Sequence, residues 1–149
     1  MGNPRIAEPL FPYRHHVDVQ IRFNDIDLFG HLNNSVYLQF MDLAKMKYFS
    51  MFMENGRFST EDLELVVVNI NCNFYSPTYI EENLEVLTAV ASISTKSLVL
   101  EQRIVNKDSG DVKCVCQTVM ACFDPKTMKS APVSDLWRQR LSDYEGRPM

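Results

Sequence analysis

The sequence predicts an α+β fold in which one antiparallel sheet curls around one long helix. The chain contains one long apolar segment with helical character, at about residues 35–53, and five segments with the composition of β-strands. The breaks between the later strands are short, which favours antiparallel hairpins because a parallel return needs a crossover of a dozen or more residues. Ten strand residues span roughly 33 Å and nineteen helical residues roughly 29 Å. A curled sheet of such strands can therefore cover the helix along its length.

The first strand is predicted from strict alternation over residues 16–23. Its apolar side chains, which should share one face, are Val17, Val19, Ile21 and Phe23. Residues 24–34 are then rich in Asn, Asp and Gly, and they end in Asn33 and Asn34. Asparagine is a favoured helix N-cap because its side-chain oxygen accepts a free backbone N–H group. We therefore expect the helix to begin there.

The helix should run from about Ser35 to Met53 and end before Asn55-Gly56, a pair suited to the left-handed turn that closes many helices. Its apolar side chains cover most of its circumference: Val36, Leu38, Phe40, Met41, Leu43, Met46, Phe49, Phe52 and Met53. Only a narrow polar strip is left. We expect other parts of the structure to wrap most of this helix.

Four longer strands follow, each rich in β-branched or aromatic residues: Leu65–Phe74, Leu84–Ile93, Leu98–Asn106 and Lys113–Phe123. A short terminal helix should follow Pro132, capped by Ser134 and packed through Leu136, Trp137 and Leu141. The 149 residues then form a single domain, with residues 1–14 as an irregular N-terminal arm. One helix covers only one face of the sheet while the strands carry apolar residues on both, so we expect a homodimer or larger homo-oligomer.

Composition and charge exclude several classes of function. Hydrophobic residues make up 46% of the chain and charged residues 23%, as in ordinary globular proteins. The net charge is −4 and no run of Lys or Arg is present, so no nucleic-acid partner is expected. Residues 1–16 lack the apolar stretch of a signal peptide or membrane span, so we expect a cytoplasmic protein without a membrane partner. The four cysteines form no metal-ligand pattern and are expected to be reduced core residues.

The segment Asn24–Asn34 combines two carboxylates, Asp25 and Asp27, and the imidazole of His31 with the start of a helix. The first N–H groups of a helix have no intrahelical partner and lie at the positive end of the helix dipole, where they can stabilise an oxyanion. A nearby carboxylate can activate water or attack a carbonyl directly, and the residues do not choose between these routes. A carboxyl group with an ordinary pKa of about 3.9 is a weak base, so an activated electrophile such as a thioester is favoured. The structural alternative is that the aspartates only cap turns and that His31 bonds a backbone carbonyl.

The same segment, Asp25-Ile-Asp-Leu-Phe-Gly-His-Leu-Asn-Asn-Ser-Val-Tyr37, resembles the D-x-D-x-x-G-H-x-N-N-x-x-Y signature of hotdog-fold acyl-CoA thioesterases of the 4-hydroxybenzoyl-CoA thioesterase type. Phe74-Tyr75-Ser76-Pro77 is similar to the aromatic-x-x-Pro at a strand end of that family, and the strand pattern fits as far as Asp124-Pro125. The resemblance covers nearly the whole chain. It implies the hotdog fold, with a sheet of five strands wrapped around the central helix.

In that family the second aspartate of the signature is the catalytic carboxylate, which implies Asp27 here, with Asp25 in a supporting role. The family's oxyanion donors correspond to the backbone of Asn34 to Val36, and His31 and Asn33 should line the pocket near the thioester. The residues expected to be catalytic are Asp27, His31 and Asn34, and those expected to bind substrate are Asp25, Asn33, Ser35, Val36 and Tyr37. The resemblance further implies a dimer or tetramer with the acyl site at a subunit boundary.

The function implied is hydrolysis of an acyl-CoA, or of an acyl group on an acyl carrier protein, without a metal or redox cofactor. CoA or phosphopantetheine would enter as part of the substrate. A non-catalytic acyl-thioester-binding protein is an alternative from another class, because fold alone does not determine function. An enoyl-thioester hydratase is disfavoured, because its Asp followed shortly by Asn-Pro-x-His is not matched by the residues after Asp27.

Overall fold

The computed structural model describes residues 2–53 and 64–149, which form one layer of strands and one long helix packed on it. In chain order the elements are β1 (His15–Val19), the 3-10 helix η1 (Phe23–Asp25), α1 (Asn34–Ser50), β2 (Glu64–Phe74), β3 (Leu84–Ile93), β4 (Ser97–Asn106), β5 (Val112–Asp124), β6 (Lys129–Ser130) and α2 (Asp135–Glu145). The antiparallel sheet has the order β1-β3-β4-β5-β2, with the two-residue β6 paired to β5. None of the described helices is long and apolar enough to span a membrane.

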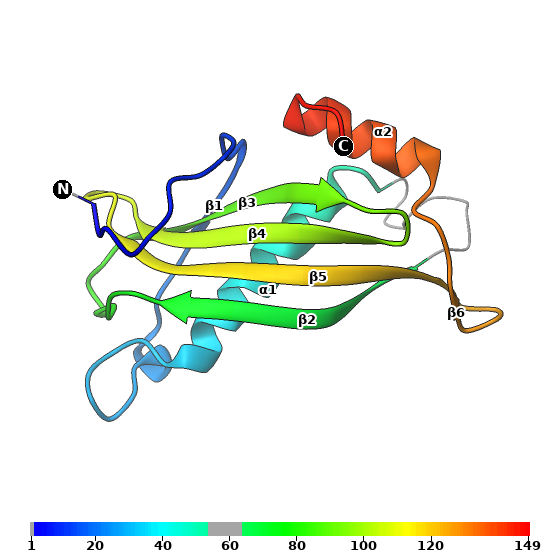
Figure 1. Cartoon of the computed structure of the whole chain (residues 1–149). Coiled ribbons are helices and arrows are strands. Elements are labelled where there is room, and N and C mark those ends of the chain that lie inside the picture. Colours follow the sequence, from blue (N-terminus) through cyan, green and yellow to red (C-terminus); the bar gives the residue numbers. More distant parts are fainter. Residues whose placement is uncertain (1, 54–63) are drawn as a thin grey trace.

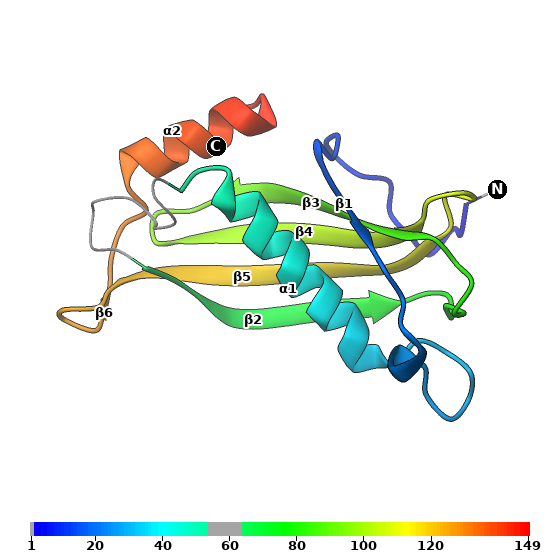
Figure 2. The same ribbon diagram turned by 180° about the vertical axis from the view of Figure 1, so that it is seen from behind.

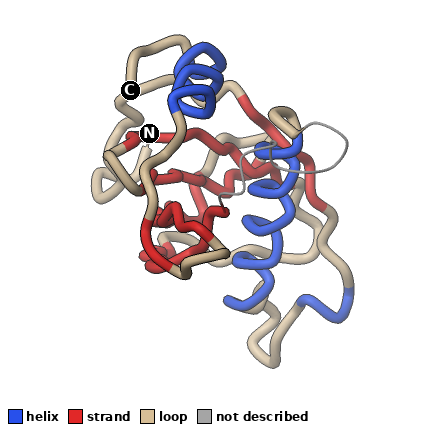
Figure 3. Tube along the Cα trace, turned by 90° about the vertical axis from the view of Figure 1, so that its right-hand side faces the viewer, coloured by secondary structure: helices blue, strands red, loops and turns tan. Residues whose placement is uncertain are grey.

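Helix α1 lies across one face of the sheet, as the views from both sides show (Figures 1 and 2). Figure 3 shows α1 beside most of the strands and α2 near one end of the molecule. The predicted hotdog architecture, a sheet curled around one central helix, is confirmed. The four long strands begin and end within one residue of their predicted limits.

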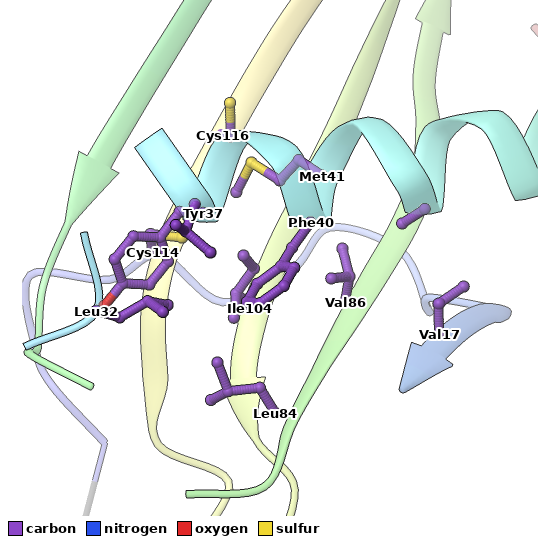
Figure 4. Close-up of a cluster of buried hydrophobic side chains, with 12 residues drawn as sticks. Val17, Leu32, Tyr37, Phe40, Met41, Leu84, Val86, Ile104, Cys114 and Cys116 are labelled. Atoms are coloured by element: carbon purple, nitrogen blue, oxygen red, sulfur yellow. The ribbon is translucent and has the colours of Figure 1, made fainter. Parts of the chain in front are cut away.

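The core lies between α1 and the sheet and consists of two groups of buried side chains. Near the start of α1, Phe40 and Met41 pack against Val86 and Ile104 (Figure 4). Near its end, the second group joins α1 to the sheet and to α2 and includes Tyr48, Phe49, Leu98, Trp137 and Leu141. The buried Gln102 side chain also donates a hydrogen bond to the backbone oxygen of Met41 (2.9 Å). Strand β4 is thereby tied to the middle of the helix.

Strand β1 is shorter than its alternating pattern predicts. Val19 pairs with Leu84, the first residue of β3. Within the described chain no strand lies beside the residues after Val19, and they turn into η1. Phe23, predicted on the buried face, is 84% exposed for this reason. The predicted limits of α1 also differ slightly, since it begins at Asn34 and its last α-helical residue is Ser50. The predicted stop signal Asn55-Gly56 lies outside the described residues.

The expectation that α1 is wrapped on most sides is wrong for the single chain. Leu38, Leu43 and Met46 remain exposed, Met46 by 56%. The reason is that the sheet covers only one side of the helix. On the opposite face of the sheet the N-terminal arm, residues 2–14, gives partial cover, because the Arg103 guanidinium of β4 donates hydrogen bonds to the Ala7 carbonyl oxygen (2.7 Å) and to the Tyr13 hydroxyl (3.1 Å).

The end of α2 is fixed to both α1 and β3. Ser134 caps the helix as predicted, and Trp137 and Leu141 are buried, whereas Leu136 is exposed against expectation because it lies on the outer side of α2. The burial of Glu145 was not indicated by any sequence pattern. One oxygen of its carboxylate accepts hydrogen bonds from the Tyr48 hydroxyl (2.7 Å) and the Val90 backbone N–H (3.0 Å).

The Glu145 contact extends to the neighbouring Arg147, whose guanidinium donates to the Val90 and Ala91 carbonyl oxygens. Strand β1 pairs with β3 only as far as Thr88. The side chains of Glu145 and Arg147 therefore bond the backbone of β3 at Val90 and Ala91, past the last residue that pairs with β1. They cover backbone groups that an edge strand would leave unpaired.

We expect Tyr48→Phe to lower the free energy of unfolding by about 1–3 kcal/mol, because it leaves a buried carboxylate with one hydrogen bond fewer. Urea unfolding would measure the change. Tyr144→Phe is the matched control, since the structure gives the Tyr144 hydroxyl no hydrogen-bond partner among the described residues, and a change below about 0.5 kcal/mol is expected. Equal losses in the two variants would contradict a stabilising role for the Tyr48–Glu145 hydrogen bond.

Candidate active site

The chain between β1 and α1 folds into a tight loop held by its own backbone. We call residues 25–37 the site segment. Ile26 and Leu32 form an antiparallel bridge, the Asp27 N–H donates to the His31 oxygen (2.8 Å), and the Asn33 N–H donates to the Asp25 oxygen (2.9 Å). The loop turns at Gly30, whose φ of 80° lies in the left-handed region that glycine adopts without strain. Asp25, Asp27, His31 and Asn33 are thus brought close together by local bonds.

The Asp27 side chain is held by one of its two oxygens. Its Oδ1 accepts hydrogen bonds from the Phe29 N–H (2.9 Å) and the His31 N–H (3.3 Å). Among the described residues Oδ2 has no hydrogen-bond partner, and the residue is half-buried. Asp27 therefore caps a turn with one oxygen and presents the other in a fixed orientation. Turn capping and a role as the reacting carboxylate are compatible.

Asp25 has a local structural role. Its Oδ2 accepts from the Arg22 N–H (2.8 Å), and this bond caps η1. The backbone oxygen of Asp25 accepts from Asn33, which joins the two ends of the loop.

At the start of α1, Asn33 is the N-cap. Its Oδ1 accepts from the Ser35 N–H (3.1 Å) and from the Ser35 hydroxyl (3.2 Å), and its backbone oxygen accepts from the Val36 N–H (2.9 Å). The Asn34 N–H has no acceptor within the described part of the chain. Of the three backbone donors expected at Asn34 to Val36, only Asn34 thus keeps its N–H available, at the positive end of the helix dipole.

His31 lies beside an aromatic residue that the sequence analysis missed. Its ring meets the Tyr79 ring edge to face, with centroids 5.3 Å apart and planes at 81°. Tyr79 follows Pro77 of the Phe74-x-x-Pro77 motif by two residues, and this proximity to a family motif was the one available signal. The site segment is bound to the same loop through the Leu32 N–H, which donates to the Thr78 oxygen (2.8 Å).

Val36 and Tyr37, expected to bind substrate, have their side chains in the core. Tyr37 is 3% exposed and its hydroxyl donates to Thr78 Oγ1 (2.8 Å). Burial raises the pKa of Tyr37, so this phenol is neutral at pH 7. The side chains of Asn33, Asn34 and Ser35, by contrast, are exposed at the surface. No three His, Cys, Asp or Glu side chains in the described ranges are placed to hold a metal ion.

Comparison with known proteins gives consistent matches. Residues 21–141 match the family described as the thioesterase-like superfamily. The chain is 26% identical over 123 residues to the long-chain acyl-CoA thioesterase FadM of Escherichia coli K12, a match that covers 83% of this chain and 93% of FadM. It is 27% identical over 116 residues to the acyl-CoA thioester hydrolase YbgC of Escherichia coli O6:H1, covering 74% of this chain and 83% of YbgC.

Solved structures share the fold. A thioesterase from Thermus thermophilus, complexed with coenzyme A and Zn, superimposes with a TM-score of 0.80 at 25% identity, covering 92% of this chain and 98% of that one. Slr0204, a 1,4-dihydroxy-2-naphthoyl-CoA thioesterase from Synechocystis, gives a TM-score of 0.76 at 21% identity, covering 87% and 96% of the two chains. The family match spans most of the chain and agrees with its signature and its fold. The chain therefore belongs to the thioesterase-like superfamily, as a hotdog-fold protein of the thioester hydrolase class.

Proposed function

We propose that this protein hydrolyses acyl-CoA thioesters to a free acid and CoA, with Asp27 as the reacting carboxylate. The observation that carries the proposal is the state of the Asp27 side chain, in which two backbone N–H groups orient one oxygen while the other has no partner in the described chain. Such an oxygen is available to a water molecule or to a carbonyl carbon. The names of FadM and YbgC, both acyl-CoA hydrolases, support this substrate class.

In the proposed reaction the thioester oxygen faces the open N–H of Asn34. As the carbonyl carbon is attacked, negative charge develops on that oxygen, and the N–H together with the helix dipole stabilises it. Asp27 takes a proton from the attacking water, or it attacks the carbon itself and forms a mixed anhydride that water then hydrolyses. In both routes the carbon–sulfur bond breaks and the CoA thiolate leaves and is protonated. His31 is proposed to line the pocket around the thioester.

The proposed substrate carries CoA rather than acyl carrier protein, in line with the relatives and with the coenzyme A in the Thermus thermophilus structure. No resident cofactor is required by the proposed chemistry, because CoA enters as part of the substrate. The four cysteines of the chain are free thiols. Free thiols are typical of a reducing compartment, which supports the cytoplasm as the proposed location.

We further propose that two copies of the chain pair through β2. Among the described residues this edge strand pairs only with β5, and its apolar residues Val66, Val67, Val68 and Ile70 are exposed, Val68 by 59%. A long apolar edge with unpaired backbone groups is a template for another strand. A second copy is the proposed occupant, because an edge strand can pair antiparallel with the identical strand of a second copy across a two-fold axis. A second copy paired with β2 would lie near the site segment, since the Phe74 ring at the end of β2 contacts the Tyr37 ring, with centroids 5.3 Å apart.

Asp27→Asn should lower kcat for thiol release by about 10² or more, because the amide keeps an acceptor for the two backbone donors but cannot act as a base or nucleophile. The assay measures free thiol from a panel of short, long and aromatic acyl-CoA esters. Asp18→Asn is the control, since this exposed carboxylate pairs with Lys107 on the surface (3.0 Å), and it should behave like the wild type. A variant that retains a tenth of wild-type kcat would contradict the role of Asp27. Wild-type protein that releases no thiol from any ester would refute the proposed activity.

Asn34→Pro removes the proposed oxyanion donor without breaking the helix. Proline is favoured at the first helical position, and the preceding residue Asn33 already has the extended φ of −65° and ψ of 138° that a following proline requires. We expect kcat to fall by about 10²–10³, while the unfolding midpoint stays near that of the wild type. Asn34→Ala, which keeps the N–H, is the matched control and should lose much less activity. If the two variants were equally active, the Asn34 N–H would not be the oxyanion donor.

The double variant Val66→Lys/Val68→Lys should convert the proposed dimer into a monomer, because charged side chains on an edge strand oppose pairing with a second strand. Sedimentation velocity would measure the mass in solution. The control is Leu136→Lys/Met128→Lys, at two exposed apolar positions away from β2. Pairing through β2 would be ruled out by a monomeric wild type or by an unchanged mass in the β2 variant.

A further inference from the structure

A second layer of contacts lies behind the site segment, in the loop that follows β2. We call residues 77–82 the brace loop. It meets the site segment at three points, namely the Leu32 N–H on the Thr78 oxygen (2.8 Å), the Tyr37 hydroxyl on Thr78 Oγ1 (2.8 Å), and the Tyr79 ring on the His31 ring. Two of these contacts involve Thr78, which is fully buried. The brace loop therefore sets where the site segment lies.

The brace loop is itself fixed by a buried lysine of β5. Lys113 is 3% exposed, and its ammonium donates to the Pro77 oxygen (3.0 Å) at one end of the loop and pairs with Glu82 Oε1 (2.7 Å) at the other. A third contact, with Asp111 Oδ2 (3.2 Å), completes its set of acceptors. An ammonium group has three donors, so all of them are used.

Glu82 connects Lys113 to Tyr79. Its Oε2 accepts from the Tyr79 backbone N–H (2.7 Å), and its Oε1 accepts from the Asn106 side chain (2.9 Å) as well as from Lys113. Burial opposes the charge on both partners. Even so, their mutual hydrogen bond keeps the pKa of Lys113 raised and that of Glu82 lowered, so the pair is ionised at neutral pH.

The chain of contacts reaches Asp27. The His31 backbone N–H is one of the two donors that hold Asp27 Oδ1 (3.3 Å), and the ring of the same residue is the one in contact with Tyr79. A displacement of His31 would therefore move a donor of the reacting carboxylate. Small displacements matter, because a misplacement of about 1 Å can cost about 10² in rate.

We propose that Tyr79 is a positioning residue that holds His31, and through it Asp27, in the geometry for catalysis, with the Lys113–Glu82 pair fixing Tyr79 in place. This inference rests on the proposed function, since it concerns the same site. The ring of Tyr79, and not its hydroxyl, makes the contact with His31. This ion pair joins the buried Lys113 to the half-buried Glu82 and serves the site by fixing a loop, since ion pairs removed from water contribute little net stability by themselves.

The first experiment compares Tyr79→Leu with Tyr79→Phe. The leucine variant should lower kcat about tenfold or more with KM within about twofold, and it should shift the His31 ring resonances in NMR spectra. The phenylalanine variant keeps the ring. Its kcat should be within about twofold of the wild-type value, and its His31 resonances should stay near their wild-type positions. Unchanged His31 resonances in Tyr79→Leu, or equal defects in both variants, would overturn the proposal.

The second experiment compares Lys113→Met with Lys107→Met, which removes an exposed lysine paired with Asp18. Only Lys113→Met should shift the His31 resonances in the direction seen for Tyr79→Leu. If that variant does not fold, Glu82→Gln replaces it, because the amide keeps an acceptor for the Tyr79 N–H and loses the charge. The spectra are recorded without substrate, so they test the positioning role even if the wild type proves inactive on acyl-CoA esters. Unshifted resonances in the folded variant would contradict anchorage by Lys113.

Discussion

One side of α1 is buried against β3, β4 and β5, and this packing fixes the position of both ends of the helix. Phe40 and Ala44 face the sheet from the middle of the helix, and Gln102 bonds its backbone there. Hydrogen bonds fix both ends, from Tyr37 to Thr78 and from Tyr48 to Glu145. A helix held in this way has a fixed N-terminus, so the Asn34 N–H, which has no acceptor among the described residues, has a defined position.

The candidate site arises where the chain changes from strand to helix. A helix start always leaves backbone donors without partners, and here Asn33 satisfies those of Ser35 and Val36 while that of Asn34 remains open within the described chain. The loop before it needs a cap, and Asp27 supplies one with a single oxygen. The same local structure thus leaves two groups without a partner among the described residues, the Asn34 N–H and the Oδ2 of Asp27. Asp27 and Asn34 both belong to the structure that joins β1 to α1, as a turn cap and as the first residue of the helix.

Much of the fold is predictable from local sequence. The strands from β2 to β5 are bounded by turn residues that act within a few positions, and Asn33 and Ser134 cap the helices as their side-chain chemistry predicts. The end of β1 was not predictable, because it depends on where β3 begins. Nor was the exposure of Met46, since an exposed apolar residue of a helix has the same sequence pattern as one buried in the core. Tyr79 and the Lys113–Glu82 pair depend on the shape of a loop and on contacts between residues far apart in the chain, which local patterns do not encode.

The proposed reaction requires that Asp27 and the Asn34 N–H act on one thioester carbonyl. Amide NMR spectra of the protein, titrated with an acyl-CoA ketone in which a methylene group replaces the sulfur, would show whether both groups contact the bound carbonyl. We expect the Asn34 amide resonance to shift downfield on binding, as for a new hydrogen bond, together with the resonances of the Phe29 and His31 amides that hold Asp27. Saturable binding that leaves these three amides unshifted and perturbs a different part of the chain would contradict it.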